Sequence, residues 1–167
     1  MTTHIETSAS VTSGIDKVWS TLSDKAYWEY DAANLSDEPG EVNEFSAGDN
    51  GLDVTLFEVL PTEALPEDVR SMVSQNLKLK RVIHFDTPAD GVAPGEMSAE
   101  IKGAPVKFTA ELTLTGDDAS TTLEAEADID VTIPMIGAVI EPKVADAVRD
   151  IIVNEVSLVE KYISDNA

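Results

Sequence analysis

Residues 121–133 read TTLEAEADIDVTI, and acidic side chains alternate with apolar or small ones along this stretch. A period of two is typical of a β-strand that buries one face and leaves the other in water. The acidic face holds Glu124, Glu126, Asp128 and Asp130. Because burial of each unpaired carboxylate would cost several kcal/mol of folding free energy, this face must be exposed to water. The strand therefore predicts an antiparallel sheet whose apolar face needs a cover.

A helix near the C-terminal end of the chain is predicted to cover this apolar face. Residues 139–163 carry apolar side chains at helical spacing, and Pro142 fits the first turn, where its missing N–H costs little. The apolar positions are Ile140, Val144, Val148, Ile151, Ile152, Leu158, Val159, Tyr162 and Ile163. At about 1.5 Å per residue, such a helix is about 35 Å long, which is enough to cross a whole sheet.

Patterns in the rest of the chain predict further strands of the same sheet and two short helices. A capping box at Ser13-Gly14-Ile15-Asp16 starts a helix, and a second helix is expected over 25–33. Strands are predicted at 5–11, 41–47, 52–60, 77–86, 97–102 and 106–115. A helical turn or two is expected within 66–74, and loops are expected at 88–95 and 103–105. The prediction is a single α+β domain over 1–167 with about seven strands.

Composition limits the classes of function. The 167 residues are 43% hydrophobic, include no cysteine, and carry a net charge of −21. This charge argues against nucleic acid and against stable membrane insertion. The acids are spread along the chain, which favours a solvated surface and a monomer, with a dimer as the alternative. The N-terminal residues lack a signal-peptide pattern, so a cytoplasmic location is expected.

The helix after the first strand carries a family resemblance. Val18-Trp19-x-x-Leu22-x-Asp24 resembles the START-like (SRPBCC, birch-pollen-allergen-like) superfamily. The segments 24–28, 103–106 and 133–141 are similar to an uncharacterised actinobacterial branch of it. The resemblance implies a helix-grip fold, in which a curved antiparallel sheet wraps around the C-terminal helix with a cavity between them. It implies no single activity.

Six residues are predicted to line that cavity and bind a ligand. They are Tyr27, Trp28, Arg81, Phe108, Ile151 and Glu155. Arg81 lies on an otherwise apolar strand face, and Glu155 lies near the apolar stripe of the long helix, as does Arg149. An inward Arg81 paired with Glu155 is one interpretation, and side chains that extend to solvent are the other. The aromatic residues either line the cavity or pack beneath the helix.

No motif indicates catalysis, a metal or a cofactor. His84 is expected on the outer sheet face and His4 at the exposed terminus. The sequence Asp49-Asn50-Gly51-Leu52-Asp53 lacks the full calcium loop, and no phosphate loop, serine elbow or HExxH occurs. We therefore predict no catalytic residue, no metal and no cofactor, and enzymatic activity is left open.

Three functions remain. The preferred one is non-enzymatic binding of a small apolar ligand such as a lipid, an isoprenoid or a polyketide-like ring. The second is a cyclase or isomerase that uses His84, Arg81 or Glu155, and the third is an acidic interaction module with a filled core. The small residues Ala99, Ala110, Ala125 and Ala127 permit either a void or a close helix. A cavity of about 300 Å³ or more would favour the binder.

Overall fold

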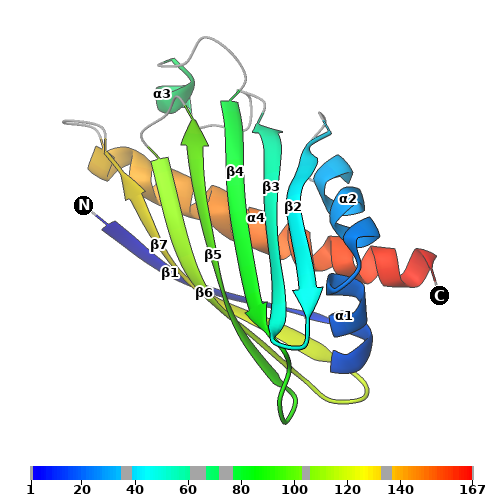
Figure 1. Ribbon diagram of the computed structural model, residues 1–167. Coiled ribbons are helices and arrows are strands. Elements are labelled where there is room, and N and C mark those ends of the chain that lie inside the picture. Colours follow the sequence, from blue (N-terminus) through cyan, green and yellow to red (C-terminus); the bar gives the residue numbers. More distant parts are fainter. Residues whose placement is uncertain are drawn as a thin grey trace.

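The computed structural model describes residues 2–34, 39–60, 67–71, 77–102, 106–132 and 137–166. Its elements run in the order predicted, with one strand, short helices, further strands and a long C-terminal helix (Figure 1). The helices are α1 (Ile15–Leu22), α2 (Lys25–Asn34), α3 (Glu67–Arg70) and α4 (Gly137–Asp165). The strands are β1 (Thr2–Val11), β2 (Glu41–Gly48), β3 (Gly51–Leu60), β4 (Leu77–Asp86), β5 (Val92–Lys102), β6 (Val106–Gly116) and β7 (Thr121–Val131).

The strands form one curved antiparallel sheet. Its order is β1-β7-β6-β5-β4-β3-β2, so the first strand closes the far edge beside the last one. Helix α4 crosses one face of the sheet, and α1 and α2 lie at the end of that face near the C-terminal half of α4 (Figure 1). The predicted helix-grip architecture is confirmed.

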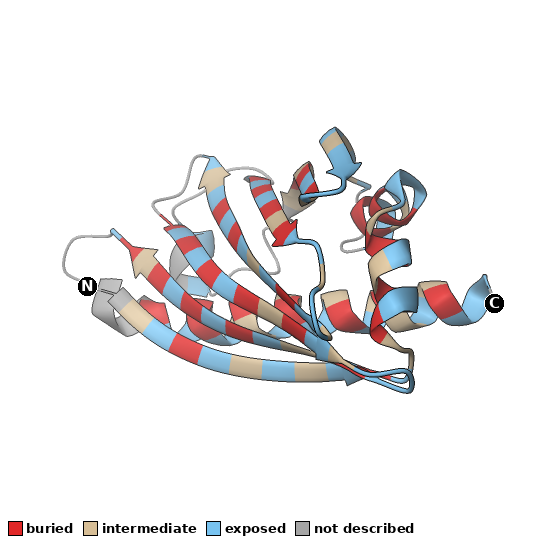
Figure 2. Ribbon diagram, turned by 60° about the horizontal axis from the view of Figure 1, so that its bottom comes forward, coloured by how far each residue is buried: buried red, intermediate tan, exposed pale blue. Residues whose placement is uncertain are grey.

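Burial alternates along the strands, as the sequence predicts (Figure 2). In β7 the side chains of Ala125, Ala127 and Ile129 are buried, whereas Glu124 and Glu126 are exposed. The core lies between this apolar face and α4, which contributes Val144, Val148, Ile152, Val156, Val159 and Ile163. The acids thus set which face of the sheet is wet.

The start of α1 differs from the predicted capping box. Gly14, not Ser13, is the N-cap residue, and no side chain caps the helix. Instead the backbone N–H of Ile15 donates to the carbonyl of Asp117 in the β6–β7 turn at 2.9 Å. A tertiary contact therefore provides a hydrogen bond at the start of α1, where the local pattern predicted a cap by the side chain of Ser13. A side chain at Gly14 would collide with that turn, because its Cβ would lie 2.8 Å from the carbonyl oxygen of Asp118.

Two further predictions about single elements are wrong. The expected loop at 88–95 is a tight turn at Asp90 and Gly91, both with positive φ, and β5 begins at Val92. Pro94 is tolerated in β5 because the ladder with β4 ends at Gly95, so Pro94 pairs with β6 alone. Pro142 lies inside α4, beyond its first turn, because the helix already begins at Gly137.

Some predictions fall outside the described residues. These are residues 66 and 72–74 of the segment 66–74, the loop at 103–105 and residues 133–136, whereas α3 (Glu67–Arg70) is the helical turn expected within 66–74. Among the described residues, no helix is long and apolar enough to cross a membrane.

Candidate functional site

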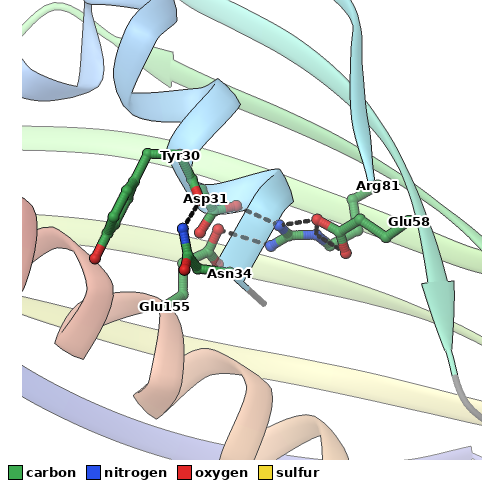
Figure 3. Close-up of polar contacts among 6 residues, drawn as sticks. All are labelled: Tyr30, Asp31, Asn34, Glu58, Arg81 and Glu155. Carbon is green, nitrogen blue, oxygen red and sulfur yellow. Dashed lines mark hydrogen bonds and ion pairs between the residues drawn. The ribbon is translucent and has the colours of Figure 1, made fainter. Parts of the chain in front are cut away.

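Four charged side chains meet between the sheet and the helices (Figure 3). Arg81 on β4 donates from one terminal nitrogen to Glu155 on α4 at 2.7 Å, and from the other to Asp31 on α2 at 2.7 Å. Its Nε donates to Glu58 on β3 at 3.1 Å, and a terminal nitrogen also contacts Glu58. The guanidinium thus joins the sheet to both helices through charge-assisted hydrogen bonds.

The cluster is shielded from water. The side chains of Arg81 and Asp31 are 0% exposed, that of Glu58 is 2% exposed and that of Glu155 is 13% exposed. Three carboxylates therefore share one cation at low dielectric. Each Coulomb interaction there is stronger than on the surface, and each uncompensated charge is more expensive.

Burial and neighbouring charge change the acidity of the cluster. Burial, followed by the charge of Glu155, raises the pKa of Asp31 from 3.8 to about 7, although Arg81 opposes this rise. Burial likewise raises the pKa of Glu58. Burial alone would lower the pKa of Arg81, but its three carboxylate partners outweigh this effect and raise that pKa well above its ordinary value. Arg81 is therefore charged at every physiological pH, whereas Asp31 titrates near neutrality.

Aromatic packing positions α2 above this cluster. The ring of Tyr27 contacts the rings of Trp28 and Tyr162 edge-on, with centroids 5.1 and 5.4 Å away. Trp28 Nε1 donates to the carbonyl of Leu22 at 2.7 Å, which ties α2 to the end of α1. These contacts place Tyr27 and Trp28, two residues of the predicted site, in the buried layer.

An apolar cavity of about 50 Å³ lies beside the cluster, at the end of the sheet covered by α1 and α2. Its lining is apolar or aromatic except for Thr121 and Glu155. The lining includes Val11, Val18, Leu22, Tyr27, Trp28, Phe85, Leu112, Leu114, Leu123, Ile152 and Val156. Because drug-sized ligands occupy about 300–1,000 Å³, the cavity in this conformation is smaller than the size expected for a binder.

One hydroxyl at the cavity wall has no partner. The phenol oxygen of Tyr27 is buried and makes no hydrogen bond within the described part of the chain, and the same holds for Asp31 Oδ1. Burial, followed by the charges of Asp31 and Glu155, raises the pKa of Tyr27 well above 10, so its hydroxyl stays protonated. Most buried polar atoms in folded proteins are hydrogen-bonded, so these two atoms require an explanation.

The six predicted site residues divide into three groups. Tyr27, Trp28 and Glu155 line the cavity, and Arg81 lies behind Glu155 in the charged cluster. Phe108 is buried in the core away from the cavity lining, and Ile151 is half-buried while its neighbour Ile152 lines the cavity. Of the two interpretations of Arg81 and Glu155, the structure has the inward pair rather than side chains that extend to solvent. The ligand-binding role of all six remains a prediction.

Sequence reasoning missed Asp31 and Glu58. A signal existed for Glu58, because it continues the period-two series Leu52, Val54 and Leu56 on the inward face of β3. Asp31 had a weaker signal, since it lies one helical turn after Tyr27 and Trp28 on a helix with little amphipathic pattern. In a chain with a net charge of −21, an acidic residue is expected on the surface unless a partner is visible, and Arg81 lies far from both in the sequence.

Other charged candidates lie outside the site. His84 is on the outer sheet face, as expected, between Asp53 and Asp86 at 2.8 Å each, so the acid and base groups of the enzyme hypothesis do not all converge. Hydrogen bonds to Asp86 and Asp53 raise the pKa of His84. Arg149 points to solvent and pairs with Asp146. Among the described residues, no three His, Asp or Glu side chains gather as metal ligands would.

Comparison with known proteins identifies a family and a fold. A family model described as "Protein of unknown function (DUF2505)" matches residues 6–163. The search of curated proteins found no match.

Three solved structures share the fold over nearly the whole chain. Zhui aromatase/cyclase from Streptomyces sp. R1128 has a TM-score of 0.61 and 14% identity, covering 98% of this chain and 94% of that one. TTHA0849 from Thermus thermophilus has a TM-score of 0.63 and 10% identity, covering 99% of both chains. Ara h 8.0201 has a TM-score of 0.55 and 9% identity, covering 99% of both chains. The predicted START-like resemblance is confirmed, and identities this low show the fold alone.

Proposed function

The chain belongs to the DUF2505 family, and on that premise we propose that it binds a small, mainly apolar molecule in the cavity beneath α1 and α2. The observation that carries the proposal is a mainly apolar cavity lined by Tyr27, whose buried hydroxyl has no hydrogen-bond partner among the described residues. Ligand pockets combine such apolar linings with a few polar groups that orient the ligand. Glu155, which also lines the cavity, is the second polar group.

Binding requires the cavity to widen. A volume of about 50 Å³ is too small for any of the ligand classes expected from the sequence. Helix α2 is the element whose displacement would enlarge it, because Tyr27 and Trp28 form one wall and belong to a helix of 10 residues. The contacts that hold α2 in place include the Arg81–Asp31 pair, the ring contact of Tyr27 with Tyr162 and the hydrogen bond from Trp28 to the carbonyl of Leu22. The structure is then the closed form of the binder.

Native mass spectrometry before and after organic extraction tests for a bound molecule. Titration with N-phenyl-1-naphthylamine, a neutral apolar dye whose fluorescence rises out of water, tests for the site itself. Val156→Phe fills the cavity, whereas Val153→Phe makes the same change on the exposed side of α4. We expect dye binding by the wild type and by Val153→Phe, and at least about tenfold weaker binding by Val156→Phe, equivalent to about 1.4 kcal/mol.

The small cavity also favours a second candidate, an acidic interaction module with a filled core. Its interaction surface would be the outer sheet face, where Glu96, Glu111, Glu126 and Glu6 lie directly opposite one another on adjacent strands. If extraction releases no molecule and the dye does not bind, the binder proposal fails. Salt-dependent binding of a lysine-rich peptide that Glu111→Lys weakens would then support the module.

A further inference from the structure

We infer that the ligand ends in a protonated amine, which Glu155 and Tyr27 receive at the cavity wall, and that a carboxylate end is excluded. This inference rests on the proposed binding in the cavity and names the chemical class of its ligand. It comes from the hydrogen-bonding capacity of Tyr27 and from the excess negative charge of the cluster that Glu155 shares with Arg81, Asp31 and Glu58.

The guanidinium of Arg81, the cation at the site, already has three carboxylate partners. A guanidinium has five N–H donors, and four of those of Arg81, from all three of its nitrogens, point to Asp31, Glu58 and Glu155. In Figure 3 these carboxylates surround the guanidinium from β3, α2 and α4. An anionic ligand end would have to displace one of them and leave that carboxylate buried without a partner. Arg81 is thus poorly suited to hold a carboxylate or phosphate.

The charge of the cluster is negative. Three carboxylates face one guanidinium, so the net charge is −2 when all are ionised and −1 when one of them is protonated. Burial is the main cause of the raised pKa of Asp31 and of Glu58, and the charge of Glu155 adds to the rise in both. A cation brought by a ligand would offset the excess charge at low dielectric, where the attraction is strong.

The buried oxygens without a hydrogen-bond partner among the described residues are suited to a ligand group that donates hydrogen bonds. Asp31 Oδ1 is a buried acceptor without a partner, and the Tyr27 oxygen can accept a bond as well as donate one. Asp31 lies close to Glu155, because the two terminal nitrogens of Arg81 donate to one of these carboxylates each at 2.7 Å, and Tyr27 lines the same cavity as Glu155. An ammonium group has three N–H donors and no acceptor, which fits this set of oxygens. A hydroxyl would satisfy one or two of them and leave the charge excess in place.

A series of probes with one apolar part and three ends tests the inference. The probes are n-octylamine, 1-octanol and octanoate, titrated calorimetrically into the wild-type protein at pH 7.5 and physiological salt. The amine is protonated there, because alkylamines titrate near the lysine value of about 10.4. We expect n-octylamine to bind at least tenfold more tightly than octanoate and more tightly than 1-octanol. Binding of octanoate or 1-octanol as tight as that of the amine would overturn the inference but leave the proposed function standing.

A protein with charge −21 also attracts amines to its surface, so the control must match charge. Glu155→Gln and Glu126→Gln each remove one carboxylate, the first from the cavity wall and the second from the outer face. We expect a tenfold loss of n-octylamine affinity in Glu155→Gln alone, whereas Glu126→Gln keeps the wild-type affinity, and urea denaturation of both variants checks that they are folded. Equal affinities in the two variants would refute the assigned role of Glu155. If no probe and no dye binds the wild type, the proposed function itself fails.

Discussion

Arg81 on β4 and Glu155 on α4 lie 74 positions apart in the chain and are joined by a hydrogen bond of 2.7 Å. This contact connects the sheet to its covering helix within a buried cluster that also contains Asp31 and Glu58. A buried ion pair adds little net stability over an apolar pair of the same shape, because both ions lose their hydration. Removing one partner is far more damaging, since the remaining charge stays buried.

The first prediction concerns Arg81→Met. The change leaves Asp31, Glu58 and Glu155 without their common cation, so we expect the free energy of unfolding to fall by about 3–5 kcal/mol in urea denaturation at pH 7.5. Arg149→Met is the matched control, because Arg149 is exposed and pairs with Asp146 on the same helix. Exposed pairs contribute about 0–1 kcal/mol. Equal losses in both variants would contradict the importance of the cluster.

The fold could be read from the sequence because few residues decide it. The alternation in residues 121–133 specifies a strand with one wet face, and no tertiary information is needed to see it. The cap of α1 could not be read in this way, because its partner is the carbonyl of Asp117, about a hundred residues later. Local patterns predict elements well when the decisive contacts are local.

The candidate site was only partly predictable for the same reason. Arg81 and Glu155 stand out against apolar neighbours, but the pairing of Arg81 with Asp31 depends on how α2 docks. The size of the cavity was open, since Ala99, Ala110, Ala125 and Ala127 permitted either a void or a close helix. All four are buried and none lines the cavity, so side chains fill that part of the interface.

The second prediction concerns pH. An acid with a raised pKa in the folded state holds its proton longer there than in the unfolded chain. The free energy of unfolding therefore falls as pH rises from the unfolded value near 3.9 to the folded value. For Asp31 the folded value is about 7, so this fall spans the interval from pH 4 to 7.

Asp31→Asn removes this titration. We expect the stability of the wild type relative to Asp31→Asn to fall by at least about 1 kcal/mol between pH 4.5 and 7.5, which corresponds to one pKa unit. Glu29→Gln, an exposed change on the same helix, serves as the control for the loss of one carboxylate. A relative stability that rises over this interval would mean that Arg81 holds Asp31 ionised.

The third prediction concerns the outer face. Glu111 on β6 lies directly opposite Glu96 on β5 and Glu126 on β7, so each neighbour repels it. We expect Glu111→Lys to raise the free energy of unfolding by about 1 kcal/mol, and the gain to shrink in about 1 M salt, where the Debye length is about 3 Å.

The same change from glutamate to lysine is expected to have the opposite effect on stability at Glu100, which lies on the same sheet face. Glu100 lies opposite Lys80 and Lys107, so Glu100→Lys replaces two attractions by two repulsions. We expect it to lower the free energy of unfolding by a similar amount. If both substitutions stabilise the protein equally, relief of the total charge of −21 would be the cause rather than the cross-strand pairs.

The fourth prediction uses Trp28 as a reporter of the cavity. Trp19→Phe leaves Trp28 as the single tryptophan, with its indole 2% exposed at the cavity wall. A ligand that enters beneath α2 must change the surroundings of this ring, so 1-octanol should shift its emission spectrum with saturation. Adding Val156→Phe should abolish the shift, whereas adding Val153→Phe should preserve it. A shift that survives Val156→Phe would place the bound ligand elsewhere on the molecule and would remove the cavity as its site.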